Sequence, residues 1–312
     1  GEKHRLEPYF NFGGRKFLHN EFFMSQYAGI IFAFIALVSW GFGDFFIQKT
    51  TRVVGSWKAL FFIGAVGLIG LFPFVKNDLA SLNSSNILLL CLLGIVVVFA
   101  ALFDFEALRQ GKIAIVEPII GLELPITVGL SLALTNETLS FLQLFFIGIV
   151  FIGIILAITA HHTHLHYHKR IFERGVILAG VGAIGMALTN FLVGVSSQDI
   201  SPLVTIWFAH SLLAVVCGIY IIYKGEFRNV ISNLKNYPKL IIGQSILDNV
   251  AWVSFAKATT FIPIAIATTI SESYIALAVL LGLFVNHEKL KRHQIVGVVL
   301  ATVGVIILSY LS

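Results

Sequence analysis

The sequence predicts an all-α integral membrane protein with ten transmembrane helices, arranged as two inverted five-helix repeats around a central cavity. Three observations support this fold class: the composition, the spacing of the apolar stretches and an internal repeat. Of the 312 residues, 57% are hydrophobic and 12% are charged, and the mean hydropathy is +0.91. Soluble proteins carry about 25% charged residues, so the composition alone indicates a membrane protein.

Ten apolar stretches approach the length of about 20 residues that a helix needs to cross a bilayer core. Short polar breaks separate them, such as KTTR at 49–52 and RQGK at 109–112. A β-barrel is not expected, because the period-two alternation of barrel strands is absent. The predicted spans are 27–47, 54–75, 86–108, 113–134, 140–160, 175–196, 202–223, 239–257, 262–285 and 295–311.

These spans divide the chain into two halves. We expect a first repeat at 24–160 and a second at 175–312, joined by a histidine-rich basic linker at 161–174. Residues 1–23 are polar and aperiodic and lack the pattern of a signal peptide. They are interpreted as an N-terminal tail or an expression remnant and left out of the predicted fold.

Basic residues predict how the spans are oriented. Loops after odd-numbered spans, including 161–174, carry most of the lysines and arginines, whereas loops after even-numbered spans carry only Lys76 and Lys257. By the positive-inside rule the first set faces the cytoplasm, in a multi-pass protein of the plasma or inner membrane. The basic tail before Met24 argues the other way.

The two halves resemble each other in sequence. Aligning Ala107 with Ala256 also aligns Glu123 with Glu272, and NETL at 136–139 then falls close to HEKL at 287–290. Near the front of each half, FGDFF at 42–46 resembles LTNFL at 188–192, which pairs Asp44 with Asn190. Five spans is an odd number, so the second half must lie inverted, an arrangement typical of transporters with a site between the repeats.

The pattern "AL…G…AIV.P……P…….L.L.NE.LS" after Ala107, followed by GIVFIG at 148–153, resembles the EamA-like branch of the drug/metabolite transporter superfamily. The second half matches with NHEKL and with GVVLATVG at 297–304. The resemblance covers about 27–311 and implies ten helices in two inverted repeats that move small metabolites, often amino acids. Tyr274 stands where the first half has Pro125, so the cavity is expected to be asymmetric.

Three carboxylates fall near the centres of predicted spans: Glu123, Asp248 and Glu272. A central carboxylate costs about 2.5–3.5 kcal/mol when it faces lipid, so these acids should face a cavity, be paired or carry a proton. Such residues mark ion, proton or substrate paths. A buried pairing with His210 is the alternative. The shallower acids Asp104, Glu106 and Glu117 are interpreted as structural groups near basic loops.

Pro125 lacks the N–H that would bond the carbonyl of Gly121. The free carbonyl next to Glu123 suggests a cation site or a hinge, with a simple packing kink as the alternative. Other polar and aromatic residues of the spans are candidates for the cavity wall, although a serine or threonine often bonds only its own helix. These candidates are Trp40, Asp44, Asn190, Asn249, Trp252, Thr268, Ser271 and Tyr274.

The linker holds five alternating histidines, which make weak candidates for a metal site. A basic linker is favoured, because nothing in the sequence fixes their geometry and no acid or cysteine is nearby. Cys91 and Cys217 lie in apolar runs and are expected to be unpaired core residues. The histidines are His161, His162, His164, His166 and His168.

Taken together, the sequence predicts a secondary transporter of a small organic metabolite, such as an amino acid or amine, that works by alternating access. The sequence leaves open whether transport is coupled to protons. A divalent-cation transporter of the same superfamily is the alternative. An integral-membrane lipid-modifying enzyme is remote, because the H-E-x-x-H and G-x-S-x-G patterns are absent. No phosphate loop supports ATP-driven transport. No cofactor, no nucleic acid and no enzymatic activity are expected, in a monomer or homodimer within the bilayer.

Overall fold

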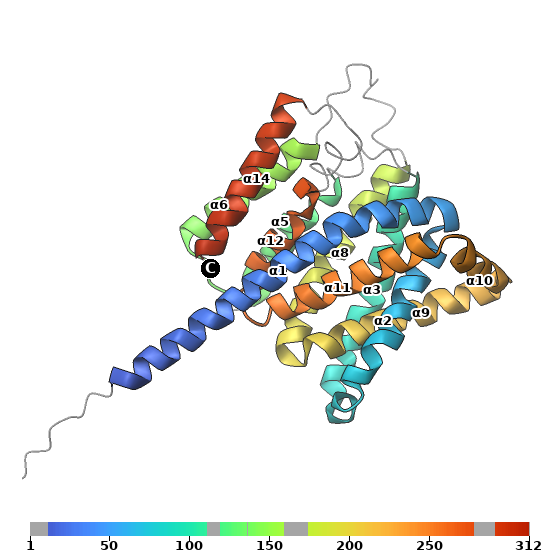
Figure 1. The fold of residues 1–312 in the computed structure, drawn as a ribbon, viewed down its shortest axis with the longest axis horizontal. Coiled ribbons are helices and arrows are strands. Elements are labelled where there is room, and N and C mark those ends of the chain that lie inside the picture. Colours follow the sequence, from blue (N-terminus) through green and yellow to red (C-terminus); the bar gives the residue numbers. More distant parts are fainter. Residues whose placement is uncertain (1–11, 111–118, 136, 159–173, 278–290, 312) are drawn as a thin grey trace, which may run out of the picture.

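The computed structural model describes residues 12–110, 119–135, 137–158, 174–277 and 291–311, and it is helical with no strand in these ranges. Figure 1 shows the helices gathered into one bundle, with α10 at one edge. The elements are α1 (Phe12–Val54), α2 (Ser56–Val75), the 3-10 helix η1 (Asp78–Ser81), α3 (Ser84–Gln110), α5 (Glu123–Leu134), α6 (Phe141–Ile158), α8 (Arg174–Asp199), α9 (Pro202–Tyr223), α10 (Phe227–Asn236), α11 (Pro238–Ala258), α12 (Ile264–Glu272) and α14 (Arg292–Leu311).

Six of these helices are long and apolar enough to cross a membrane: α1 from Ser25, α2, α3 to Ala107, α8 from Ile177, α9 and α14. Three shorter apolar helices lie at the fourth, fifth and ninth predicted spans. The eighth corresponds to α11, which has 21 residues but carries Gln244, Asp248 and Asn249. The chain is therefore a multi-pass membrane protein, and the count of ten spans stays a prediction.

Two expectations about helix boundaries are wrong. Helix α1 begins at Phe12, inside the segment that was left out of the predicted fold, and its first turns extend away from the bundle (Figure 1). A ten-residue helix, α10, lies where only a loop was expected, and Val230 is its single buried side chain. A helix of ten residues is too short to be found by a search for apolar stretches long enough to cross a membrane.

The contacts between the halves come in matched pairs. Equivalent helices pack on each other: α2 on α9, α5 on α12, and α6 on α14. The contact of α1 with α11 is matched by that of α8 with α3, and α1 with α12 by α8 with α5. This is the pattern that a two-fold relation between two equivalent units produces.

Glycines let these equivalent helices touch closely. A Cβ added at Gly64 of α2 would lie 2.6 Å from the backbone nitrogen of Ala214 in α9. A Cβ at Gly153 of α6 would likewise lie 2.6 Å from the backbone nitrogen of Ala301 in α14. Small residues that bring backbones together are the usual means of packing helices in lipid, and Figure 1 shows α6 and α14 running side by side.

Glu137, from the repeated NETL stretch, ties the two halves together. Its carboxylate accepts hydrogen bonds from the backbone N–H groups of Ile264 at 2.5 Å and of Ala265 at 3.4 Å, at the start of α12. The hydroxyl of Ser131 in α5 donates to the same carboxylate. Helix starts have N–H groups without partners inside the helix, so an acid in the first half caps a helix of the second.

Candidate functional site

The two halves meet around a small cavity of about 70 Å³. Its wall includes side chains from α1, α2, α3, α5, α8, α9, α11 and α12, so both halves contribute. The predicted site residues that line it are Trp40, Asp44, Glu123, Asn190, His210, Asp248, Trp252, Glu272 and Tyr274.

Two interrupted helices bring Glu123 and Glu272 together. Residues 121–122 form a turn, and α5 begins at Glu123, whereas α12 ends at Glu272 before a turn at Ser273. The fourth and ninth predicted spans are therefore not continuous helices. Both glutamates are about 5% exposed or less, and the side-chain amide of Asn190 contacts both carboxyl groups.

Asn190 on α8 bridges this glutamate pair. Its Nδ2 donates to Glu123 Oε1 at 3.1 Å and to Glu272 Oε1 at 3.2 Å. The uncharged amide of Asn190 thus donates one hydrogen bond to each of the two glutamates, and we call this arrangement the clamp.

The interruption of the fourth span lies directly before Pro125, which is the third residue of α5 and is exposed. A proline in the first turn of a helix costs little, because the N–H it lacks would have no helical partner there. The kink is thus a break at Gly121 and Leu122 rather than a bend within one helix. That the break acts as a hinge stays a prediction.

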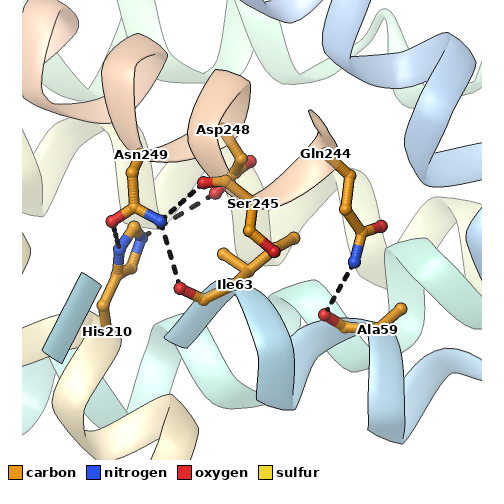
Figure 2. A network of polar contacts seen from close by, with 7 residues as sticks. All are labelled: Ala59, Ile63, His210, Gln244, Ser245, Asp248 and Asn249. Carbon is orange, nitrogen blue, oxygen red and sulfur yellow. Dashed lines mark hydrogen bonds and ion pairs between the residues drawn. The ribbon is translucent and has the colours of Figure 1, made fainter. Parts of the chain in front are cut away.

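A second polar group surrounds Asp248 (Figure 2). His210 Nδ1 lies 2.8 Å from Asn249 Oδ1, and His210 Nε2 lies 3.9 Å from Asp248 Oδ2. Asn249 Nδ2 donates to the carbonyl oxygens of Ile63 and Ser245 at 3.1 and 2.8 Å. The predicted pairing of a central acid with His210 therefore has a counterpart in the structure.

Aromatic rings stand beside the acids. Trp40 packs edge-on against Trp252 with ring centroids 5.1 Å apart, and against Tyr274 at 6.1 Å. Trp252 and Tyr274 line the same cavity as Asp248 and Asp44. The wall thus combines carboxyl groups with aromatic faces.

Three predicted site residues do not line the cavity. Thr268 and Ser271 are fully buried within the packing of α12, and the Ser271 hydroxyl donates to the carbonyl of Ala267 at 2.8 Å on its own helix. Asn249 turns toward α2 instead and contacts His210 from behind. The expected polar face of the ninth span is therefore limited to Glu272 and the neighbouring Tyr274.

Asp104 was interpreted as a structural acid, and this is wrong. It lines the cavity, and its Oδ1 has no hydrogen-bond partner among the residues that the structure describes. Helical spacing could have revealed it, since Val97, Ala101 and Asp104 share one face of α3 and all three line the cavity.

The other shallow acids behave differently. Glu106 accepts hydrogen bonds from Ser56 at 2.9 Å and from Arg109 Nη2 at 2.6 Å, which confirms it as a paired group. This pairing raises the pKa of the Arg109 guanidinium. Glu117 lies outside the described residues, as does the whole candidate set of linker histidines at 161–168.

The charge of the wall is one-sided. Five carboxyl side chains line the cavity, from Asp44, Asp104, Glu123, Asp248 and Glu272, and none of the described lining residues is a lysine or arginine. Within the described ranges, no group of three or more histidine, cysteine, aspartate or glutamate side chains is arranged to hold a metal ion. Cys91 and Cys217 are both unpaired thiols.

Comparison with known proteins adds the family and the fold. The model of the EamA-like transporter family matches residues 27–159 and 173–310. A search of curated proteins gave no match. A solved structure described as "Crystal structure of protein" is similar with a TM-score of 0.68 and 16% identity, over 89% of this chain and 94% of that chain. At this identity the likeness shows the fold alone.

Proposed function

The chain belongs to the EamA-like transporter family, and on that premise we propose that it is a secondary transporter of a small organic metabolite with a positively charged amino group, such as an amine or amino acid. The observation that carries the proposal is the cavity wall, where five carboxyl groups meet without a described lysine or arginine.

A cation is the ligand that such a wall stabilises. A buried carboxylate without a counter-charge is costly in a medium of low dielectric. An ammonium group entering the cavity would supply that charge and hydrogen bonds to several carboxyl oxygens. The faces of Trp40, Trp252 and Tyr274 would add cation–π attraction, whereas an anionic or uncharged metabolite would gain neither.

The cavity must enlarge to hold such a metabolite. At about 70 Å³ it has room for about two water molecules of roughly 30 Å³ each. We therefore interpret this arrangement as a closed form between two open ones. The interruptions at residues 121–122 and at Ser273 are the places where α5 and α12 would move, because non-helical backbone at membrane depth is tolerated where it lines a cavity.

The two-repeat family match supports a proposal for the rest of the arrangement. We propose ten spans in two inverted units around the cavity, which the matched helix contacts support. The basic loops after odd-numbered spans would face the cytoplasm, in the plasma or inner membrane. The transporter would act as a monomer or homodimer.

A flux assay on purified full-length protein in proteoliposomes tests the proposal. A thermal-shift screen against amines, amino acids, sugars, nucleotides and divalent metals first selects ligands, since a ligand of the folded form raises the melting temperature. We expect amines or amino acids to stabilise the protein and to be exchanged across the membrane.

The double variant Glu123→Gln, Glu272→Gln should lose at least 100-fold in flux, because the carboxamides cannot supply charge. Glu226→Gln, which changes an exposed acid outside the cavity, is the matched control. Stabilisation by sugars or nucleotides alone would contradict the cationic class, and stabilisation by divalent metals alone would favour a metal transporter.

A further inference from the structure

The side-chain amide of Asn249 is fixed in one orientation. Its Nδ2 donates to two backbone carbonyl oxygens, of Ile63 in α2 and of Ser245 in α11. Only a nitrogen can make these two contacts, so the opposite atom, which faces His210 Nδ1 at 2.8 Å, is the amide oxygen. Figure 2 shows the amide between the histidine and these carbonyls.

This orientation fixes the tautomer of His210. An amide oxygen only accepts hydrogen bonds, so Nδ1 must carry a hydrogen. In a neutral imidazole the other nitrogen then holds a bare lone pair. That nitrogen, Nε2, faces Asp248 Oδ2 at 3.9 Å.

Asp248 and His210 therefore need one proton between them. An ionised Asp248 beside a neutral His210 would oppose a carboxylate and a lone pair, with no hydrogen to join them. One added proton removes the conflict, either as a carboxylic acid facing Nε2 or as an imidazolium facing a carboxylate. The Trp252 indole, on the same helix and lining the same cavity, can donate only its own hydrogen, so it does not change this count.

The proton can reach the cavity but not the α2 side. A Cβ at Gly67 would lie 2.6 Å from His210 Nδ1 and 2.5 Å from Asn249 Oδ1, so α2 closes that side tightly. His210 and Asp248 both line the cavity. The other titratable groups of the wall are Asp44 on α1, Asp104 on α3, Glu123 on α5, Glu272 on α12 and Tyr274 just after α12, while α2 and α8 contribute no titratable side chain among the described lining residues.

We propose that Asp248 and His210 form the proton-coupling site of the transporter, separate from the glutamate pair that binds the substrate's ammonium group. This rests on the proposed function. When a monovalent cation enters the cavity, the O–H or N–H bond of the pair breaks, the proton leaves to water, and the cation takes its charge. One cation is thereby exchanged for one proton, with no change in the charge of the site.

The first test reads the proton directly and needs no substrate. In full-length protein carrying ¹⁵N-histidine in lipid nanodiscs, the His210 signals are assigned by their loss in His210→Gln. We expect Nδ1 to be protonated in wild type and the Nε2 signal to move in Asp248→Asn. A bare Nδ1, or signals that are unchanged in Asp248→Asn, overturns the proposal.

The second test measures coupling with tetramethylammonium as the probe. Adding it to weakly buffered, detergent-solubilised protein should release about one proton per chain from wild type, and none from Asp248→Asn or His210→Gln. Ser245→Ala is the matched control, since it removes a neighbouring buried hydroxyl without a titratable group, and it should behave as wild type.

Each outcome separates this inference from the proposed function. No proton release from wild type, or full release from Asp248→Asn, shows that the proton is structural and overturns the coupling. Failure of every amine and amino acid to be exchanged in the flux assay, with the ¹⁵N pattern as expected, would instead remove the proposed substrate class.

Discussion

The acids of this protein fall into two regions with different partners. At the ends of the helices, Glu106 pairs with Arg109, Glu226 with Lys58 at 2.5 Å, and Glu137 with the start of α12. Around the cavity, the partners of Glu123, Glu272 and Asp248 that the structure describes are an asparagine and a histidine, with no lysine or arginine among them. The outer acids are already neutralised, whereas the inner ones are available to a cation or a proton.

Asp104 and Glu106 show how local this difference is. They are two residues apart on α3, so their side chains point to different sides of the helix. Glu106 reaches Ser56 and Arg109, and Asp104 reaches the cavity. The function of an acid in this bundle is therefore set by its direction as much as by its depth.

The largest loss of stability should come from removing the side-chain amide of Asn190, which donates to the two glutamates of the cavity. Asn190→Leu leaves the glutamate pair without two hydrogen bonds, each worth about 1.5–3 kcal/mol to a charged group, so we expect about 3–6 kcal/mol of destabilisation. Thermal unfolding in detergent measures it.

Thr189→Val is the control for that variant, since the Thr189 hydroxyl bonds only the carbonyl of Gly185 on its own helix. Adding Glu123→Gln and Glu272→Gln to Asn190→Leu should restore much of the loss, because two carboxamides can pair. An Asn190→Leu protein as stable as wild type would contradict the clamp.

The next largest effect concerns the helix cap. Glu137→Ala leaves the N–H groups of Ile264 and Ala265 without their acceptor, which should cost about 1–3 kcal/mol. Thermal unfolding should show this loss beside an unchanged Asp199→Ala, which removes an exposed acid at the end of α8. Equal stability of the two variants would mean that water replaces the cap.

A smaller effect should separate Asp104 from Glu106. Asp104→Asn replaces one of the five carboxyl groups of the cavity wall and should weaken binding of a cationic ligand by about tenfold, equivalent to about 1.4 kcal/mol. Glu106→Gln should leave binding unchanged and lower only the melting temperature. The measurement is equilibrium binding of an amine to each variant. Equal affinities would contradict the conclusion that Asp104, but not Glu106, faces the ligand.

The smallest effect is a pH dependence of stability at the outer pair. The hydrogen bond and charge of Lys58 lower the pKa of Glu226 below its ordinary value of 4.5. The ionised form is therefore favoured by folding, so its contribution is present above pH 4.5 and fades as the pH falls through the lowered folded-state pKa. The melting temperatures of wild type and Glu226→Gln should converge at low pH. A difference between them that grows as the pH falls would contradict this prediction.

Much of the outline was predictable because apolar length and repeated residues are read directly from a sequence. The positions of the spans and the central placement of Glu123, Asp248 and Glu272 follow from these signals. Direction around a helix does not, which is why Asp104 was misassigned and why Thr268 and Ser271 were expected in the wall. The break at residues 121–122 depends on tertiary packing, which overrides local propensity, whereas α10 is too short for a search for membrane spans to find.

The cap at Glu137 has a consequence for how the protein assembles. The acid and the helix start that it holds belong to different halves, so these halves recognise each other through a specific contact and not merely through the linker between them. Two polypeptides cut within that linker should therefore still associate. Two copies of the first half alone would lack the backbone of Ile264 and Ala265 that Glu137 binds.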